Sequence, residues 1–155
     1  MMDTKGQIAL EYLLMFFVVL IIISTITIPL LYSGIETADD LAEGVKVKSM
    51  LTEISKNVQL ISVLDDNSKR SVSIYVPGDL VLYYRLHDNR HYIYTTLTLS
   101  DSSRRKIEVE VPCKVSFNNN SNHYYSSLKN RWYYNVEIKW VESADGQRSV
   151  NVGFK

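Results

Sequence analysis

The chain is poor in cysteine and carries no excess charge, and both shortages narrow its possible functions. Its 155 residues include one cysteine, Cys113, so no disulfide forms within the chain. We expect this thiol to be buried and inert, the alternative being a bond to another chain. Lysine plus arginine equals aspartate plus glutamate at 17 each, so the net charge does not indicate nucleic-acid binding.

Catalytic and metal-binding motifs are also missing. The sequence has no phosphate-binding glycine loop, no nucleophile elbow and no Cys-x-x-Cys pattern. His87 and His91 flank a predicted hairpin turn beside Asp88, and such a group is more often a set of polar turn residues than a metal site. The sequence therefore gives no support to an enzyme, a cofactor or a metal centre.

A long apolar run dominates the first third of the chain. The segment from Tyr12 to Leu31 carries no charge, and its polar residues are only Ser24, Thr25 and Thr27. About 20 apolar residues suffice to cross a bilayer as a helix, which satisfies every backbone polar group internally. We expect this segment to span the membrane during at least one stage of the protein's life.

One carboxylate, Glu11, stands at the start of this run. A charge at the centre of a membrane helix costs roughly 2.5–3.5 kcal/mol on insertion scales, so such groups are functional candidates. Glu11 has a simpler interpretation too, as an interfacial acid in the first helical turn, where the helix dipole favours it. Alternatively, removal of a leader after Gly6 makes Gln7 the N-terminus, and its ammonium can pair with Glu11 of a neighbouring subunit.

The order of these residues resembles a known family. Lys5-Gly6-Gln7, with Glu11 as the fifth residue after the glycine and an apolar stripe beyond, resembles an archaeal type IV-pilin-like precursor. More narrowly, residues 7–11 are similar to the Gln-x-Ser-x-Glu signature of class III signal peptide pilins of methanogens, with Ala9 in place of serine. The resemblance covers roughly the first 30 residues.

This resemblance implies a life history for the chain. A prepilin peptidase cuts between Gly6 and Gln7, and an assembly platform with its ATPase builds a helical homo-oligomeric filament in which Glu11 sets the register. The precursor lies in the cell membrane with its N-terminus cytoplasmic, and the mature subunit belongs to an extracellular pilus that attaches to surfaces. The alternatives are a minor pilin or adhesin, a single-pass membrane-anchored protein that never polymerises, and, ranked lower, an archaellum subunit.

The helical pattern continues beyond the apolar run. Pro29 removes one helical hydrogen bond, so either one long helix bends there or two helices meet between Tyr32 and Gly34. In the second case Ser33 is the N-cap and Glu36 completes a capping box. Pro29 and Gly34 are thus the predicted kink or joint.

Residues 32–66 are predicted to form an amphipathic helix that packs on a β-rich head. Apolar residues recur there three or four positions apart. They are Ala38, Leu41, Val45, Met50, Leu51, Ile54, Val58 and Ile61.

Residues 67–155 are predicted to form the extracellular head, because the apolar period changes to two. Strands are expected over 72–76, 80–86, 92–99, 107–111, 132–140 and 150–154, with 113–117 as a candidate continuation. Asn118–Asn130 reads as a polar loop, and Asp145-Gly146 as a hairpin turn. The expected fold is α+β, a long N-terminal helix carrying an antiparallel sandwich or curled sheet.

Two surface features of the head are candidates for contacts. Asn119 begins an Asn-x-Ser pattern on the polar loop and is a candidate glycan acceptor. Eleven tyrosines are many for this length, and aromatic residues favour interfaces. The candidate contact tyrosines are Tyr83, Tyr92, Tyr94 and Tyr133.

Overall fold

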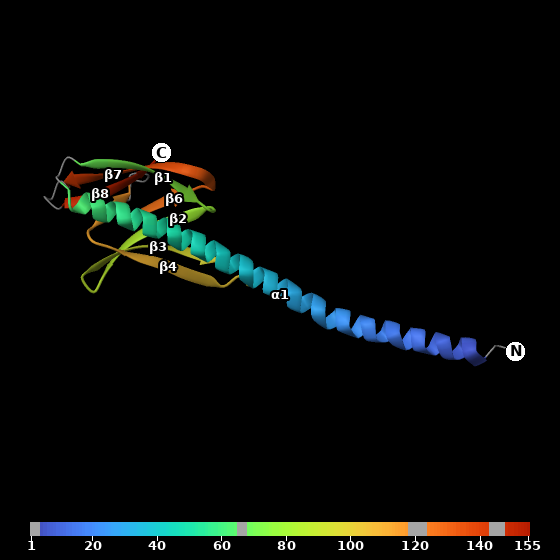
Figure 1. Cartoon of the computed structure of the whole chain (residues 1–155). Helices are drawn as coiled ribbons and strands as arrows, with labels where there is room; N and C mark the ends of the chain where they lie inside the picture. The colour runs from blue at the N-terminus through green and yellow to red at the C-terminus, as the bar shows by residue number, and fades with distance from the viewer. Residues whose placement is uncertain (1–3, 65–67, 118–123, 143–147) are drawn as a thin grey trace. The chain divides into compact units, whose positions relative to one another are not determined.

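The computed structural model describes residues 4–64, 68–117, 124–142 and 148–155, and these form one helix and eight strands (Figure 1). The helix α1 spans Thr4–Ser62. The strands are β1 Lys69–Val76, β2 Leu80–His87, β3 Arg90–Thr98, β4 Arg104–Val111, β5 Val115–Phe117, β6 Tyr125–Leu128, β7 Arg131–Glu142 and β8 Arg148–Phe154. The chain divides into two compact units, residues 1–39 and 40–155.

The first unit is helical throughout its described part. Of the two alternatives at Pro29, one long helix or two helices that meet between Tyr32 and Gly34, the structure has one long helix. A single helix runs through Pro29, and it does not restart at Ser33. The N-cap interpretation of Ser33 is therefore wrong, and the Thr37 hydroxyl instead donates to the Ser33 carbonyl at 2.8 Å, a contact within the helix. A lone proline removes one amide donor but leaves the rest of the hydrogen-bond ladder intact, so the helix continues.

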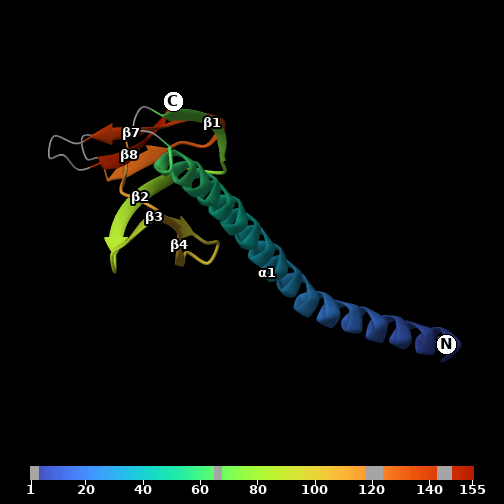
Figure 2. The ribbon, with the colours of Figure 1, turned by 60° about the vertical axis from the view of Figure 1, so that its left-hand side comes forward.

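The second unit contains two four-stranded sheets around one core (Figures 1 and 2). Their strand orders are β1-β7-β8-β5 and β4-β3-β2-β6. All pairs are antiparallel except β5 with β8, where Val115 lies opposite Val150 in a parallel pair. The α+β architecture expected from the sequence is confirmed, with this parallel pair as an addition.

The part of α1 within the second unit supplies one wall of the core. The buried apolar side chains of this part of the helix are Val47, Met50, Leu51, Ile54, Val58 and Ile61. The predicted stripe is wrong at its start, because the exposed fractions of Leu41 and Val45 are 64% and 60%. Residue 45 lies two positions before 47, about 200° around the helix, so one face cannot bury both.

Two side-chain hydrogen bonds join this part of the helix to the two sheets. The Trp140 indole N–H in β7 donates to the Ile61 carbonyl at 2.9 Å. The Ser55 hydroxyl donates to the Glu110 carbonyl in β4 at 2.7 Å. Each sheet is thus tied to the helix by a directional contact as well as by apolar packing.

The predicted hairpin at residues 87–90 is confirmed. Asp88 and Asn89 both have positive φ angles, 49° and 60°, as a two-residue type I′ turn requires. The turn joins β2 to β3, with His87 opposite Arg90.

The polar loop predicted over Asn118–Asn130 is wrong in its second half. Residues 125–128 form β6, which pairs with β2 from Leu80↔Leu128 to Tyr83↔Tyr125. Ser126 and Leu128 are buried. This serine-rich segment therefore forms a short strand at the edge of the sheet, which its polar sequence did not predict. Residues 118–123, with Asn119, and the Asp145-Gly146 turn lie outside the described residues.

The C-terminus is tied into the sheet, as expected. Lys155 and Asn135 exchange backbone hydrogen bonds of 3.0 and 3.3 Å. The Lys155 ammonium also donates to the Glu137 carboxylate, which lowers the pKa of that carboxyl.

Candidate processing and assembly segment

The predicted cleavage and register positions follow one another along the start of α1. Gly6 and Gln7 lie in the first turn of the helix, and Glu11 lies four residues beyond Gln7. Because an α-helix has 3.6 residues per turn, residues 7 and 11 lie on one side of it, about one turn apart. Gln7, the predicted new N-terminus, thus lies about one helical turn from Glu11.

Glu11 lies in an apolar setting. A shallow groove of about 390 Å³ is lined by Glu11 and by four apolar residues, Leu10, Leu14, Met15 and Val18. Within the part of the chain that the structure describes, the Glu11 carboxylate makes no hydrogen bond or ion pair. The described residues thus leave this carboxylate without a printed partner beside an apolar groove.

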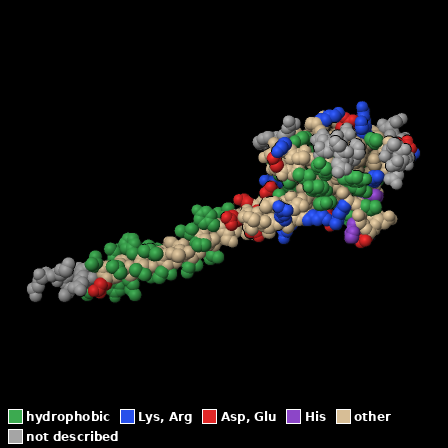
Figure 3. Space-filling model, turned by 180° about the vertical axis from the view of Figure 1, so that it is seen from behind, with side chains coloured by type: hydrophobic (Ala, Val, Ile, Leu, Met, Phe, Trp, Pro, Cys, Tyr) green, Lys and Arg blue, Asp and Glu red, His purple; other side chains and the backbone are tan. Residues whose placement is uncertain are grey.

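The apolar surface of the first unit has no cover within the unit. Every described side chain from residue 8 to residue 39 is exposed, and hydrophobic side chains cover this unit in Figure 3. Leaving some twenty large apolar side chains in water would cost on the order of tens of kcal/mol. The helix is long and apolar enough to cross a membrane, with a mean hydropathy of 2.8 in its most apolar window. Its length and apolar surface fit a membrane anchor.

The few polar groups of this helix are compatible with an apolar surrounding. The Thr25 hydroxyl donates to the Ile21 carbonyl at 2.7 Å, so it needs no partner from outside the helix. Pro29 has no amide hydrogen, and the carbonyl of Thr25 loses its usual helical donor. This lost hydrogen bond keeps Pro29 as the predicted kink, whereas the continuous helix excludes a joint between two helices at Gly34.

The histidines do not form a metal site among the described residues. His87 lies near Asp88, with 3.4 Å between Nε2 and the carboxylate, and both side chains are exposed. His91 instead contacts the Tyr84 hydroxyl through Nδ1 at 2.6 Å. The described residues contain no group of three side chains suited to hold a metal ion.

Three of the four candidate tyrosines gather on one face of the sheet β4-β3-β2-β6. Tyr83 and Tyr94 stack with ring centroids 5.2 Å apart. The Arg85 guanidinium lies over the rings of Tyr92 and Tyr94, at 5.5 and 5.8 Å. Tyr133 lies elsewhere, on β7, so the four do not form one surface.

Sequence reasoning missed a cleft of about 710 Å³ in the second unit, which we call the tyrosine cleft. Its walls come from β2, β3, β8 and the residues around them, so no local sequence pattern reveals it. Its lining residues include Tyr84, His91, Cys113, Lys114, Tyr124 and Arg148. Cys113 is half-buried, less than expected, and this desolvation raises the pKa of its thiol to about 11, which favours the unreactive protonated form.

Comparison with known proteins adds one match. Residues 4–30, well under half of the chain, match the family described as Class III signal peptide. No curated protein and no solved structure matches the chain. The matched segment contains Gly6, Gln7 and Glu11 and most of the apolar run, so it confirms the resemblance drawn from those residues. The match supports a type IV pilin-like precursor, a substrate of a prepilin peptidase.

Proposed function

We propose that the chain is a structural subunit of an extracellular type IV-like archaeal pilus. One observation carries the proposal: the class III signal peptide leads directly into a helix whose apolar surface is exposed on all sides. Before processing, this apolar surface contacts lipid. After processing, it packs against the helices of other copies. The β-rich second unit supplies the outer surface of the filament, which attaches to other surfaces.

Processing prepares the contact between subunits. Cleavage between Gly6 and Gln7 creates a positive α-amino group next to the apolar segment. Docked against another copy, this ammonium pairs with the Glu11 carboxylate, and two unit charges 4 Å apart attract by about 4 kcal/mol at an effective dielectric constant near 20. A helix shifted along its neighbour leaves both charges unpaired in an apolar setting, so the pair selects the register.

The remaining partners follow from the same proposal. The precursor lies in the cell membrane with its N-terminus in the cytoplasm and residues 40–155 outside. A prepilin peptidase, an assembly platform and an ATPase act on it in turn. Asn119 is the proposed glycan acceptor of the exported part.

Processing is tested by mass spectrometry of the protein made in a host that contains a class III prepilin peptidase. We expect the mass of Met1–Gly6 to be lost and the chain to begin at Gln7. Gly6→Val should leave the full mass, because a branched side chain obstructs the peptidase at the cleaved bond. A native protein that keeps Met1 or Met2 contradicts the proposal and leaves a membrane-anchored surface protein.

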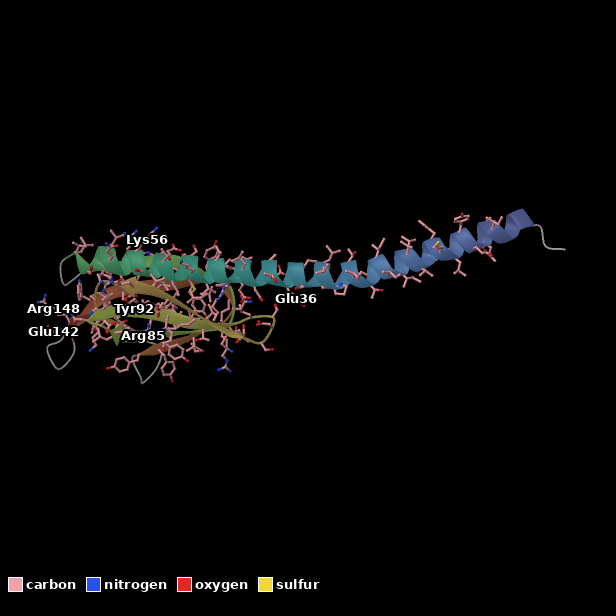
Figure 4. The ribbon with its side chains drawn as sticks, turned by 90° about the horizontal axis from the view of Figure 1, so that it is seen from below. Glu36, Lys56, Arg85, Tyr92, Glu142 and Arg148 are labelled. Carbon is pink, nitrogen blue, oxygen red and sulfur yellow. The ribbon has the colours of Figure 1, made fainter. Side chains whose placement is uncertain are left out.

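Assembly is tested by a matched pair of variants, Glu11→Gln and Glu36→Gln. Glu36 is an exposed acid farther along the same helix (Figure 4), so its substitution removes one charge without touching the proposed pair. We expect normal processing in both, and a loss of filaments by electron microscopy only with Glu11→Gln. Equal filament yields would refute the register role of Glu11, while filaments that persist without this chain would identify a minor pilin.

A further inference from the structure

Three lysines gather on the side of the sheet β1-β7-β8-β5 that faces away from the core. Lys69 lies directly opposite Lys139 in the β1–β7 pair (Figure 1). The Lys139 ammonium is 3.8 Å from the Glu137 carboxylate, to which the Lys155 ammonium also donates. The pKa of Glu137 is lowered chiefly by Lys155, and further by the charges of Lys139 and Lys69. Three positive charges thus share one negative charge, and we call these four residues the lysine face.

The lysine face carries more positive than negative charge, and it is accessible. Like charges directly opposite each other on paired strands destabilise a sheet, so the Lys69–Lys139 pair is unfavourable in the single chain. Lys69 forms no ion pair within the described residues. The side chains of Lys139 and Lys155 are 44% and 68% exposed, and Lys69 is exposed too. A negatively charged partner can therefore reach this face.

An exposed aromatic pair lies farther along the same two strands. Tyr75 and Tyr133 meet edge to face, with ring centroids 6.3 Å apart, and they are 40% and 64% exposed. Between this pair and the lysine face the exposed side chains are small and polar, namely Ser71, Ser73 and Asn135. The two strands thus offer a low surface, with positive charge at one end and rings at the other, along which a helix can lie.

The chain also carries a surface of the opposite sign. Four acids of α1 recur three or four positions apart and therefore lie on one side of the helix. They are Glu36, Asp39, Asp40 and Glu43. Like charges at this spacing destabilise a helix, and residues 12–45 contain no lysine, arginine or histidine to offset them. Asp40 accepts hydrogen bonds from Ser100, but the carboxylates of the other three form no ion pair or hydrogen bond within the described residues.

We propose that the lysine face docks against this acidic side of α1 in a second copy, an inference that rests on the proposed pilus. In the single chain each surface is destabilised by like charges, and in the assembly each supplies the counter-charge that the other lacks. The lengths agree, since residues 36–43 span about 10 Å of helix. Lys139 and Lys155, which pairs with Asn135, are separated by about 13 Å of strand. Because two different surfaces meet, repetition of this head-to-tail contact builds an open helical filament.

Charge exchange tests the contact, in the cells used for the filament experiment and with each variant as the only copy of the chain. The pair Lys69→Glu and Lys139→Glu should lower the filament yield at least about tenfold, because the face then repels the acids. Adding Glu36→Lys and Asp39→Lys to that chain should restore filaments, because the two surfaces again differ in sign. Glu36→Gln alone leaves three acids in place, so that variant should still assemble.

The matched control is the pair Arg104→Glu and Arg105→Glu. It makes the same change of charge at exposed positions of β4, in the other sheet, and should leave the filament yield unchanged. Circular dichroism in detergent micelles verifies that each variant is folded.

The outcomes separate this inference from the proposed function. Equal yields from the lysine variant and the unchanged chain, or a loss of filaments that the exchanged acids do not repair, would overturn the contact alone. Normal filaments of the lysine variant that no longer bind polygalacturonate would assign the face to an acidic polysaccharide and overturn the contact as well. Absence of filaments from the unchanged chain would refute the pilus and the contact together.

Discussion

Ile54 provides the most direct test of how the helix stabilises the second unit. Its side chain is fully buried in the core between the helix and the sheets. Ile54→Ala removes three carbon atoms, a transfer loss of roughly 2.4 kcal/mol at about 0.8 kcal/mol per buried group. The unfilled space adds to this, so we expect the free energy of unfolding to fall by about 2–5 kcal/mol.

Val45 is the matched control, because it lies on the same helix and is 60% exposed. Val45→Ala should change the free energy of unfolding by less than about 0.5 kcal/mol. Both substitutions thus introduce alanine into the same helix, and they differ in the burial of the side chain that is removed.

Urea unfolding of the full chain in detergent micelles, followed by tryptophan fluorescence, measures both effects. Trp140 is a suitable reporter because its indole donates to the Ile61 carbonyl at the end of the helix. Thermal unfolding should show the same order, with a midpoint about 8–20 °C lower for Ile54→Ala. If Ile54→Ala is as mild as Val45→Ala, the helix does not form a wall of the core, and the reasoning fails.

Three further predictions concern single contacts. Ser55→Ala removes the 2.7 Å hydrogen bond to the Glu110 carbonyl and should lower the free energy of unfolding in urea by about 0.5–1.5 kcal/mol. The Asn130 amide donates to Asp79 at 2.7 Å and lowers the pKa of that carboxyl from 3.8, so its stabilisation is present above pH 3.8 and is lost as the pH falls through the folded-state pKa. Asp79→Asn should therefore weaken the acid dependence of the unfolding midpoint below about pH 5, and an unchanged pH profile would count against this contact. Because burial raises the pKa of Cys113 to about 11, iodoacetamide should alkylate the folded chain far more slowly than the urea-unfolded chain at about pH 8, and equal rates would contradict this burial.

The local part of the fold was accessible from sequence because its signals are local. Alternation of apolar residues predicted the strands, and the pair Asp88-Asn89 matched a turn that needs two positive φ angles. The roles of Gly6, Gln7 and Glu11 were assigned from their order and from the resemblance that this order carries, and they stay predictions. Each of these signals lies within about one turn or one strand of chain.

The missed features depend on contacts between distant parts of the chain. Strand β6 was read as loop because Tyr125-Ser-Ser-Leu128 has little apolar content, and only its pairing with β2 makes it a strand. The helical stripe was predicted to begin at Ala38 and to include Leu41 and Val45, whereas burial begins at Val47, because a short apolar pattern fits two helix faces and the sheets decide between them. The tyrosine cleft was missed because its lining residues come from parts of the chain that are distant in sequence.

The two parts of α1 explain why the proposed assembly combines processing with a charge pair. From Val47 onward the helix is apolar on one side, and the sheets of the same chain cover that side. In the first unit the apolar side chains of the described residues 8–39 are exposed and have no cover within that unit. Lipid tails are as apolar as these side chains, so lipid and neighbouring helices cover them equally well. The hydrophobic effect alone therefore does not favour a filament over the membrane. In the proposed filament, a buried ion pair between Glu11 and a new Gln7 ammonium would break this balance, because only a docked, processed neighbour in the correct register would neutralise both charges.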